Sequence, residues 1–501
     1  MIVGEEKPFT TTVMVKSIIV FILNYAILLA ITLFLVFLHD TSGYSEYLAE
    51  NLTILFFVAV CLFLLYWIIY LYYFFENRTF LSEMKNIWMV FILIDICVIA
   101  SWAFGYYIDV YLRPVTLLAL LALFLIGYRD AIFLNIVYAV IMFVIDVFID
   151  YSVYVSTGIN NQMFASFMIC FISGMFAVFV GNMAKTRASV LVTGVVAAVP
   201  LVIIITLLEI IDYTNLQASA LLLNIAFGFG GSMISAVLIL AILPIFESLF
   251  SVLTVFRLRE LTSPDAKLLK RLKTEALGTF NHSMTVAQLA ESCASALGEN
   301  VELARAAAYY HDVGKLREPQ YFTENQFEGN PHDELTPELS ADIIRSHTKD
   351  GYDLIMANHL PKFFADVALE HHGTLPIKYF YAKALRMSDG EINIENFSYQ
   401  GPKPQSKIAA IIMISDACEA ATRSLTDRTP EKVEQAVRGI IQERMDLEQF
   451  SECDITMAEL NTIKGTLVSA LTGLYHHRIK YPDVRFTRGG GVEDKGGKVD
   501  A

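Results

Sequence analysis

The chain has 501 residues, of which 55% are hydrophobic, and it carries a formal net charge of -14. Ordinary globular domains contain about 45–50% apolar residues, so this composition excludes a simple soluble protein of the same size. The acidic balance also argues against a DNA or RNA partner, because proteins that coat nucleic acid need a basic surface. Long apolar runs end near residue 250 and a polar sequence follows Arg257, which predicts one part in lipid and one in water.

Eight apolar segments in the first half predict membrane spans. Most have about 20 apolar residues, the length that crosses a hydrocarbon core of ~30 Å, and the fourth is shorter. The predicted spans are 15–38, 51–75, 87–105, 115–128, 131–151, 163–181, 190–211 and 221–250. The expected fold is therefore all-α: a transmembrane bundle of about eight helices in residues 1–250, followed by an all-helical soluble domain.

The distribution of basic residues predicts the orientation in the lipid bilayer. With the N-terminus inside, only Arg113 falls in an outside loop. Nine basic residues fall inside: Lys7, Lys16, Arg78, Lys85, Arg129, Lys185, Arg187, Arg257 and Arg259. Positive charge concentrates in cytoplasmic loops, and an even number of spans returns the chain to the same side. We expect a multi-pass protein of the cell membrane with a cytoplasmic C-terminal half.

Asp95 lies in the middle of the third predicted span. A carboxylate at that depth costs several kcal/mol unless it is paired or protonated. It is either a ligand or relay site or the partner in a hydrogen bond between helices, and the hydrogen bond is the simpler interpretation.

The second half divides into a linker helix over residues 251–275, a helical domain over 276–484 and a tail over 485–501. Ser263-Pro264 marks a helix start within the linker. The tail is rich in glycine and charge and has no periodicity, which is typical of disorder. The six cysteines form no CxxC pair, as expected for a reduced, cytosolic domain.

Nine of the ten histidines lie in this second half. Imidazole and carboxylate side chains together suit Fe, Mn, Zn or similar ions. A buried carboxylate such as the one in IIMISDACEAA is costly unless a cation meets it. One such residue alone is usually structural, whereas an ordered set is more specific. The set comprises His282, His311, Asp312, His347, His371, His372 and Asp416. A second dipeptide, His332-Asp333, lies in a loop and is expected to form a lid or a substrate wall rather than to bind metal.

This ordered set resembles the seven-ligand motif of the HD phosphohydrolase superfamily. The flanking sequence is similar, more narrowly, to the seven-transmembrane HD family, from about Tyr111 to Pro482. The segments that carry this resemblance are LRELTSPDAKLLKRLKTEALGTFNHS, YYHDVGKLREPQYFTENQ, NPHDELTPELSADIIRSHTKDGYDL, LEHHGT and YQGPKPQSKIAAIIMISDACEAATRSL. The resemblance implies an enzyme that binds the cyclic dinucleotide cyclic di-AMP and hydrolyses it to pApA.

The resemblance also implies which residues do this. One divalent ion, Mn or Fe on family grounds, is held by His282, His311, Asp312 and Asp416. Asp312 bridges to a second ion, which His347, His371 and His372 complete. Two such ions activate a shared water for attack on phosphorus in line with the departing oxygen. Lys315, four residues after His311, is expected to bind the phosphate or assist the leaving group, and Thr374 to help hold a phosphate.

Two departures from the family pattern stand out. The family usually carries a large extracytoplasmic domain after the first span, and here only residues 39–50 occupy that place. Leu277 and Phe280 stand where the family usually has Pro and Tyr. The related HD-GYP branch cuts cyclic di-GMP, but its GYP signature is absent from the sequence GTLPIKYFY that follows the histidine pair.

Several alternatives stay open at this point. The chain could be a nucleotidase or another phosphohydrolase, a receptor that binds a cyclic dinucleotide without cutting it, or a channel or transporter with a regulatory domain. The intact ligand set favours an enzyme. The soluble domain also offers a surface through which two copies could form a homodimer.

Overall fold

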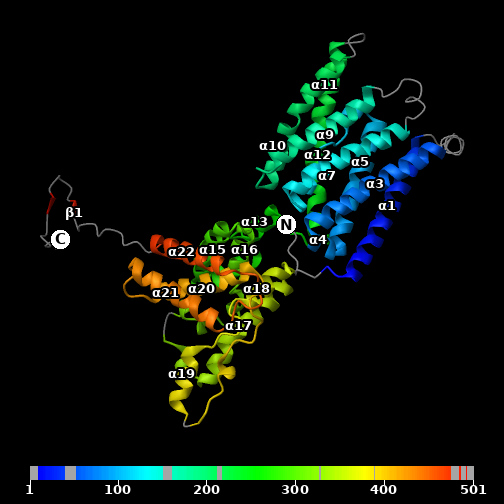
Figure 1. Cartoon of the computed structure of the whole chain (residues 1–501). Helices are drawn as coiled ribbons and strands as arrows, with labels where there is room; N and C mark the ends of the chain where they lie inside the picture. The colour runs from blue at the N-terminus through cyan, green and yellow to red at the C-terminus, as the bar shows by residue number, and fades with distance from the viewer. Residues whose placement is uncertain are drawn as a thin grey trace. The chain divides into compact units, whose positions relative to one another are not determined.

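The computed structural model forms two compact units, Met1–Leu261 and Thr262–Ala501 (Figure 1). It describes residues 9–39, 52–149, 161–211, 217–326, 329–388, 390–474, 485–486 and 492–493. Both units are helical, which confirms the predicted all-α fold. In the tail predicted to be disordered, β1 (Arg485–Phe486) and β2 (Val492–Glu493) pair antiparallel, and the remaining tail lies outside the described residues.

The first unit is a bundle of long apolar helices. Within the described residues, seven helical stretches are long and apolar enough to cross a membrane, so this is a multi-pass membrane protein. The elements are α1 (Thr11–His39), α3 (Leu52–Glu76), α4 (Arg78–Ser82), α5 (Met84–Tyr107), η1 (Val110–Leu112), α6 (Leu117–Leu125), α7 (Tyr128–Ile149), α9 (Asn161–Gly181), α10 (Arg187–Ala197), α11 (Val199–Ile211), α12 (Ala218–Leu249) and α13 (Val255–Leu261). Together α10 and α11 make one of the seven stretches.

The fourth predicted span, 115–128, is not a full transmembrane helix. It corresponds to α6, which has 9 residues, a length of ~13.5 Å at 1.5 Å per residue. That is less than half of a hydrocarbon core of ~30 Å. Pro114 precedes α6, and its missing N–H and fixed φ interrupt the helix there. Eight of the nine side chains of α6 are buried, so it is an internal helix packed among the others.

Arg113, expected in an outside loop, is instead buried in an ion pair. Its Nη1 lies 2.6 Å from Asp146 Oδ2 and its Nη2 3.0 Å from Asp146 Oδ1, a bidentate arrangement. Nη1 also donates to Ser166 Oγ at 2.6 Å. The two charges neutralise each other, which is what lets both stay out of water. Gly127 lies in the short connection between the end of α6 and the start of α7, whereas Arg113 pairs with Asp146 near the end of α7. Residues 113–125 therefore run antiparallel to α7.

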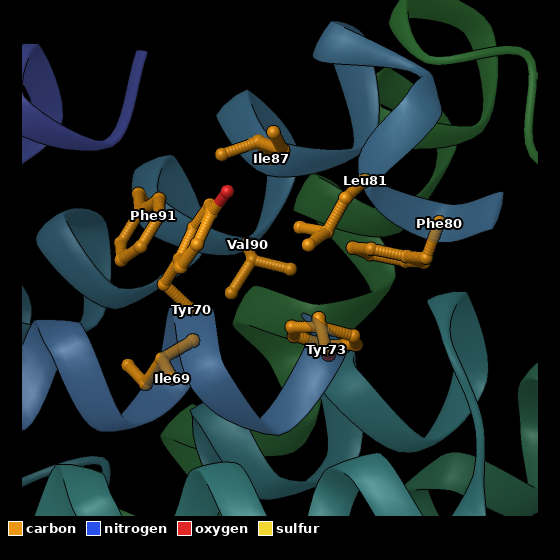
Figure 2. A pocket seen from close by; sticks show the side chains of 8 residues that line it. All are labelled: Ile69, Tyr70, Tyr73, Phe80, Leu81, Ile87, Val90 and Phe91. Atoms are coloured by element: carbon orange, nitrogen blue, oxygen red, sulfur yellow. The ribbon is translucent and has the colours of Figure 1, made fainter. Parts of the chain in front are cut away.

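Asp95 forms the hydrogen bond between helices that its sequence position suggested. Tyr66 of α3 donates its hydroxyl proton to Asp95 Oδ1 of α5 at 2.9 Å, and both residues are buried. A small pocket lies nearby in the same unit, where α3, α4 and α5 meet (Figure 2). Its lining is aliphatic and aromatic, without a charged side chain: Ile69, Tyr70, Tyr73, Phe80, Leu81, Ile87, Val90 and Phe91. No lysine, arginine or histidine lines it.

The second unit packs its helices around α15 and α20. Here α15 contacts α16, α20 and α22, and α17 packs along α18. Side chains from Ile408 to Ser415 are continuously buried, so α20 forms the centre of the core. The elements are α14 (Lys267–Glu275), α15 (Leu277–Leu297), α16 (Val301–Tyr310), α17 (Pro337–Ala357), α18 (Lys362–Glu370), α19 (Lys378–Met387), α20 (Lys407–Ser424), α21 (Pro430–Asp446) and α22 (Met457–Leu474), with the short 3-10 helices η3 (Val313–Leu316), η4 (Pro319–Tyr321), η5 (Thr323–Asn325), η6 (Pro331–Asp333) and η7 (Ile394–Phe397).

The linker expected to be one helix over residues 251–275 contains two. They are α13 and α14, and the two units divide between them, after Leu261. Pro264 lies in this break, where its ring and missing N–H prevent a continuous helix.

Candidate metal centre

The structure brings all seven predicted ligands into one buried cluster. Their ligand atoms form three overlapping groups, within each of which every atom lies within 4.8 Å of the others. The groups are His347, His371 and His372; His282, His311 and Asp416; and His311, Asp312 and His371. These residues are separated by up to 134 positions, as between His282 and Asp416, and come from α15, α16, α17, α18 and α20 or the residues directly after them.

Asp312 lies between the two halves of the cluster. Its Oδ2 is 3.4 Å from His311 Nε2 and 3.7 Å from His282 Nε2. Its Oδ1 faces the other half, 3.4 Å from His347 Nε2 and 3.6 Å from His371 Nε2. A carboxylate with one oxygen toward each half can bridge two ions.

The unsatisfied atoms of this cluster fit a metal site. Neither carboxylate oxygen of Asp312 accepts a hydrogen bond of good geometry, and His311 Nε2 has no partner either, although all three atoms are buried. The Lys315 ammonium, 2.7 Å from Asp312 Oδ2, offsets part of the cost of burying this carboxylate, and an ion between the ligand atoms would offset more of it. His347 Nε2 and His371 Nε2 also face each other at 3.2 Å, as two nitrogens that share one ion would.

Backbone carbonyls orient three of the imidazoles. Nδ1 of His311 lies 2.7 Å from Ala308 O, and Nδ1 of His371 lies 2.8 Å from Ala368 O. Both histidines follow the last residue of a helix, where carbonyls lack partners within the helix. In α17, His347 makes the equivalent contact through Nδ1. A proton held on Nδ1 leaves the Nε2 lone pair facing the cluster.

Burial and polar contacts shift the pKa values of the candidate ligands in different directions. Burial lowers the pKa of His347 to about 3, so this imidazole is neutral, the form that binds metal. Burial also favours neutral His282, but hydrogen bonds with Asp416 and Glu419 outweigh it and raise the pKa of His282 to about 10. Burial alone would raise the pKa of the Asp416 carboxyl, yet His282 holds it well below its usual range.

Lys315 reaches into the cluster. Its Nζ lies 2.7 Å from Asp312 Oδ2 and 2.8 Å from Glu324 Oε1. Burial disfavours its charge, but Asp312 and Glu324 outweigh burial and raise the pKa of the Lys315 ammonium. Glu324 also accepts a hydrogen bond from Thr279 Oγ1 at 3.1 Å. The backbone approaches closely here, since a Cβ on Gly278 would lie 1.9 Å from Glu324 O.

Thr374 follows the histidine pair in a tight turn held by Gln449. Thr374 N donates to Gln449 Oε1 at 3.0 Å, and Gln449 Nε2 donates to Thr374 Oγ1 at 3.0 Å. Gly373 in this turn has φ +51°, a left-handed conformation that favours glycine. Tyr399 stacks on the neighbouring ligand His372, with ring centroids 4.4 Å apart.

His332 is in none of the ligand groups found among the described residues. Its Nε2 donates to Tyr321 O at 3.0 Å, and its ring packs against Phe380 with centroids 4.9 Å apart. The contacts of His332 are those of a packing residue, and the expectation that it does not bind metal stays a prediction from the sequence.

Sequence reasoning missed Glu324, Glu419, Tyr399 and Gln449. Each contacts a candidate site residue that is not its neighbour in sequence, from 9 positions away for Glu324 to 137 for Glu419, and none belongs to a local metal-ligand pattern. Gln449, for example, is 75 residues from Thr374.

Two family models match the chain in succession. The model of "7TM receptor with intracellular HD hydrolase" matches residues 17–254, and that of the HD domain matches residues 279–421.

Two curated relatives carry the name cyclic-di-AMP phosphodiesterase PgpH. The one from Listeria monocytogenes is 44% identical over 313 residues, 62% of this chain and 44% of the relative. The one from Bacillus subtilis is 44% identical over 333 residues, 65% of this chain and 46% of the relative. The chain therefore spans less than half of the length of these relatives.

Solved structures of the L. monocytogenes PgpH HD domain are also similar. One is 50% identical and covers 42% of this chain and 100% of that domain, with a TM-score of 0.41. A second, in complex with cyclic di-AMP, is 50% identical and covers 43% of this chain and 99% of that domain, with a TM-score of 0.41. The membrane unit is thus similar to that of 7TM receptors with an intracellular HD hydrolase, and the second unit contains a match to the HD domain.

Proposed function

We propose that this chain is a metal-dependent phosphodiesterase of the membrane that hydrolyses cyclic di-AMP to pApA. The observation that carries the proposal is Asp312, a buried carboxylate whose two oxygens face two separate sets of histidines. The substrate follows from the names of the two curated relatives, both cyclic-di-AMP phosphodiesterases.

The ligands divide into two sets around Asp312. His282, His311, Asp312 and Asp416 would hold one divalent ion, and Asp312, His347, His371 and His372 would hold the second. The donor set of imidazoles and carboxylates suits Mn or Fe, the ions that we propose. Bound ions would supply Lewis acidity and an activated water for attack on phosphorus.

Lys315 and Thr374 would bind the phosphate. The ammonium of Lys315 is charged and held between two carboxylates, so it can neutralise a non-bridging phosphate oxygen or the departing 3′ oxygen. Gln449 Nε2 donates to the Thr374 hydroxyl at 3.0 Å, while the reverse contact from that hydroxyl to Gln449 Oε1 is long, at 3.4 Å. The hydroxyl proton of Thr374 is therefore available to a phosphate oxygen.

The HD domain is proposed to face the cytoplasm. Nine basic residues lie in segments that would then face the cytoplasm. Arg113 is the one basic residue expected on the outside, and its charge is neutralised by the ion pair with Asp146. Residues 113–125 run antiparallel to α7, and we propose that α6 together with the non-helical chain before it makes the eighth crossing, since α6 alone is too short to span the bilayer. The pairing of two chains through the HD domain, and the lack of a nucleic-acid partner, stay predictions from the sequence.

The substrate is tested on the full chain purified in detergent and supplied with Mn or Fe. Cyclic di-AMP, cyclic di-GMP and a linear dinucleotide are offered in parallel, and the products are separated by chromatography. We expect conversion of cyclic di-AMP to pApA at the highest kcat/KM. Binding of cyclic di-AMP without cleavage under either metal would favour a receptor, and neither binding nor cleavage would show that the substrate is wrong.

A further inference from the structure

His282 has a carboxylate behind its ring, where three other candidate ligand histidines have a backbone carbonyl. Nδ1 of His311, His347 and His371 contacts a carbonyl of its own helix. Nδ1 of His282 instead lies 2.7 Å from Oε2 of Glu419, a carboxylate on another helix. On its other side, His282 Nε2 lies 2.9 Å from Asp416 Oδ1 and faces the cluster.

Glu419 lies on the same face of α20 as Asp416, because residues three apart in a helix are neighbours. Its side chain is buried, with the residue 2% exposed, and belongs to no group of candidate ligand atoms among the described residues. The nearest cation is Arg423, whose Nη1 is 3.7 Å from Glu419 Oε1 and whose side chain is 43% exposed. The close polar contact of this buried carboxylate is therefore the imidazole of His282.

We propose that Glu419 is a positioning residue that accepts the Nδ1–H of His282 and so aims the Nε2 lone pair of this ligand at the metal. The proposal rests on the proposed metal-dependent function. A carboxylate on the far nitrogen fixes the tautomer and the ring orientation, and it makes the imidazole a stronger donor to the ion. One face of α20 thus supplies a ligand, Asp416, and the group that orients the ligand opposite it.

The first test is metal binding by the full chain in detergent, after chelation and with Mn²⁺ titrated back by calorimetry. Glu419→Gln keeps the size and an acceptor oxygen but removes the charge, and Glu419→Ala removes both. Loss of such a partner typically weakens metal binding about 10–100-fold. We expect one of the two binding events to weaken by about this factor in Glu419→Ala and by less in Glu419→Gln. Glu434 is an exposed glutamate on α21, and Glu434→Gln is the matched control. This variant should bind Mn²⁺ as the parent does.

The second readout is the rate of cyclic di-AMP hydrolysis at rising Mn²⁺. If Glu419 acts through the metal, added Mn²⁺ restores kcat in Glu419→Gln, whereas a damaged fold would not be rescued. The metal-free melting temperature shows whether each variant is folded, and Glu419→Gln decides the question if Glu419→Ala does not fold. Unchanged Mn²⁺ affinity in the folded variants, with a parent that binds and cleaves, would overturn only the role of Glu419. A parent that binds no metal would overturn the proposed function as well.

Discussion

Lys315 Nζ lies 2.7 Å from Asp312 Oδ2, so a buried ammonium touches the carboxylate at the centre of the candidate metal site. Glu324 holds the same ammonium from the other side, at 2.8 Å. Lys315 can therefore neutralise charge on a bound phosphate while its stem stays fixed. The helix end that supplies His311 and Asp312 also supplies this cation, three residues after Asp312.

Replacing Lys315 tests this arrangement. We expect Lys315→Met to lower kcat for cyclic di-AMP by about 100-fold, comparable to the loss of one donor to developing negative charge. Mn²⁺ affinity should not fall, because the ammonium competes with metal for the charge of Asp312. Steady-state kinetics and calorimetry check the two expectations. Lys349→Met, at an exposed position of α17, is the control, and a normal kcat in Lys315→Met would exclude this role.

Replacing Thr374 tests the proposed phosphate contact. Thr374→Val removes the hydroxyl at nearly constant volume and should lower kcat/KM about tenfold, or ~1.4 kcal/mol, the scale of one hydrogen bond to a charged group. Thr374→Ser keeps the hydroxyl and should stay near the parent. Metal content, measured by mass spectrometry, should be equal in all three proteins. Equal kcat/KM in the valine and serine variants would show that the hydroxyl does not bind substrate.

The buried pair of Arg113 and Asp146 predicts a stability effect in the membrane unit. Arg113→Met leaves Asp146 as an uncompensated buried charge and should destabilise the protein by about 3–5 kcal/mol. Adding Asp146→Leu should recover part of this loss, because the two sites are in contact and their effects are not additive. Arg129→Met is the control, since its pair with Glu76 is exposed and should contribute little. Thermal unfolding in detergent measures the parent, Arg113→Met, Asp146→Leu, the double variant and the Arg129→Met control. Additive losses of the two single variants in the double variant would contradict the pairing.

The orientation in the membrane is testable by labelling. Tyr107 at the end of α5 is 67% exposed and Met183 after α9 is 79% exposed, and the proposed topology places them on opposite sides. In a cysteine-free background, a membrane-impermeant maleimide applied to intact cells should label Tyr107→Cys and not Met183→Cys. The reverse pattern would place the HD domain outside the cell.

The clustering of the seven candidate ligands could be predicted from the sequence, because histidine and aspartate in a fixed order are typical of metal sites. Glu419 could not, since it acts through His282 from 137 residues away and a single glutamate in a helix carries no signal. The sequence also predicts one more long membrane helix than the described residues contain. The apolar run at 115–128 has the composition of a span. Pro114 interrupts the helix before α6, and the pairing of Arg113 with Asp146 shows how that part of the chain can still lie inside the bundle.

The central claim is metal-dependent hydrolysis at Asp312, and one assay tests it most directly. The full chain is incubated with excess chelator, assayed for conversion of cyclic di-AMP to pApA, and assayed again after Mn or Fe is restored, with Asp312→Ala in parallel. We predict that chelation abolishes the activity of the parent, that one of these ions restores it, and that Asp312→Ala stays inactive throughout. Full activity after prolonged chelation, or a normal rate in Asp312→Ala, would contradict the account.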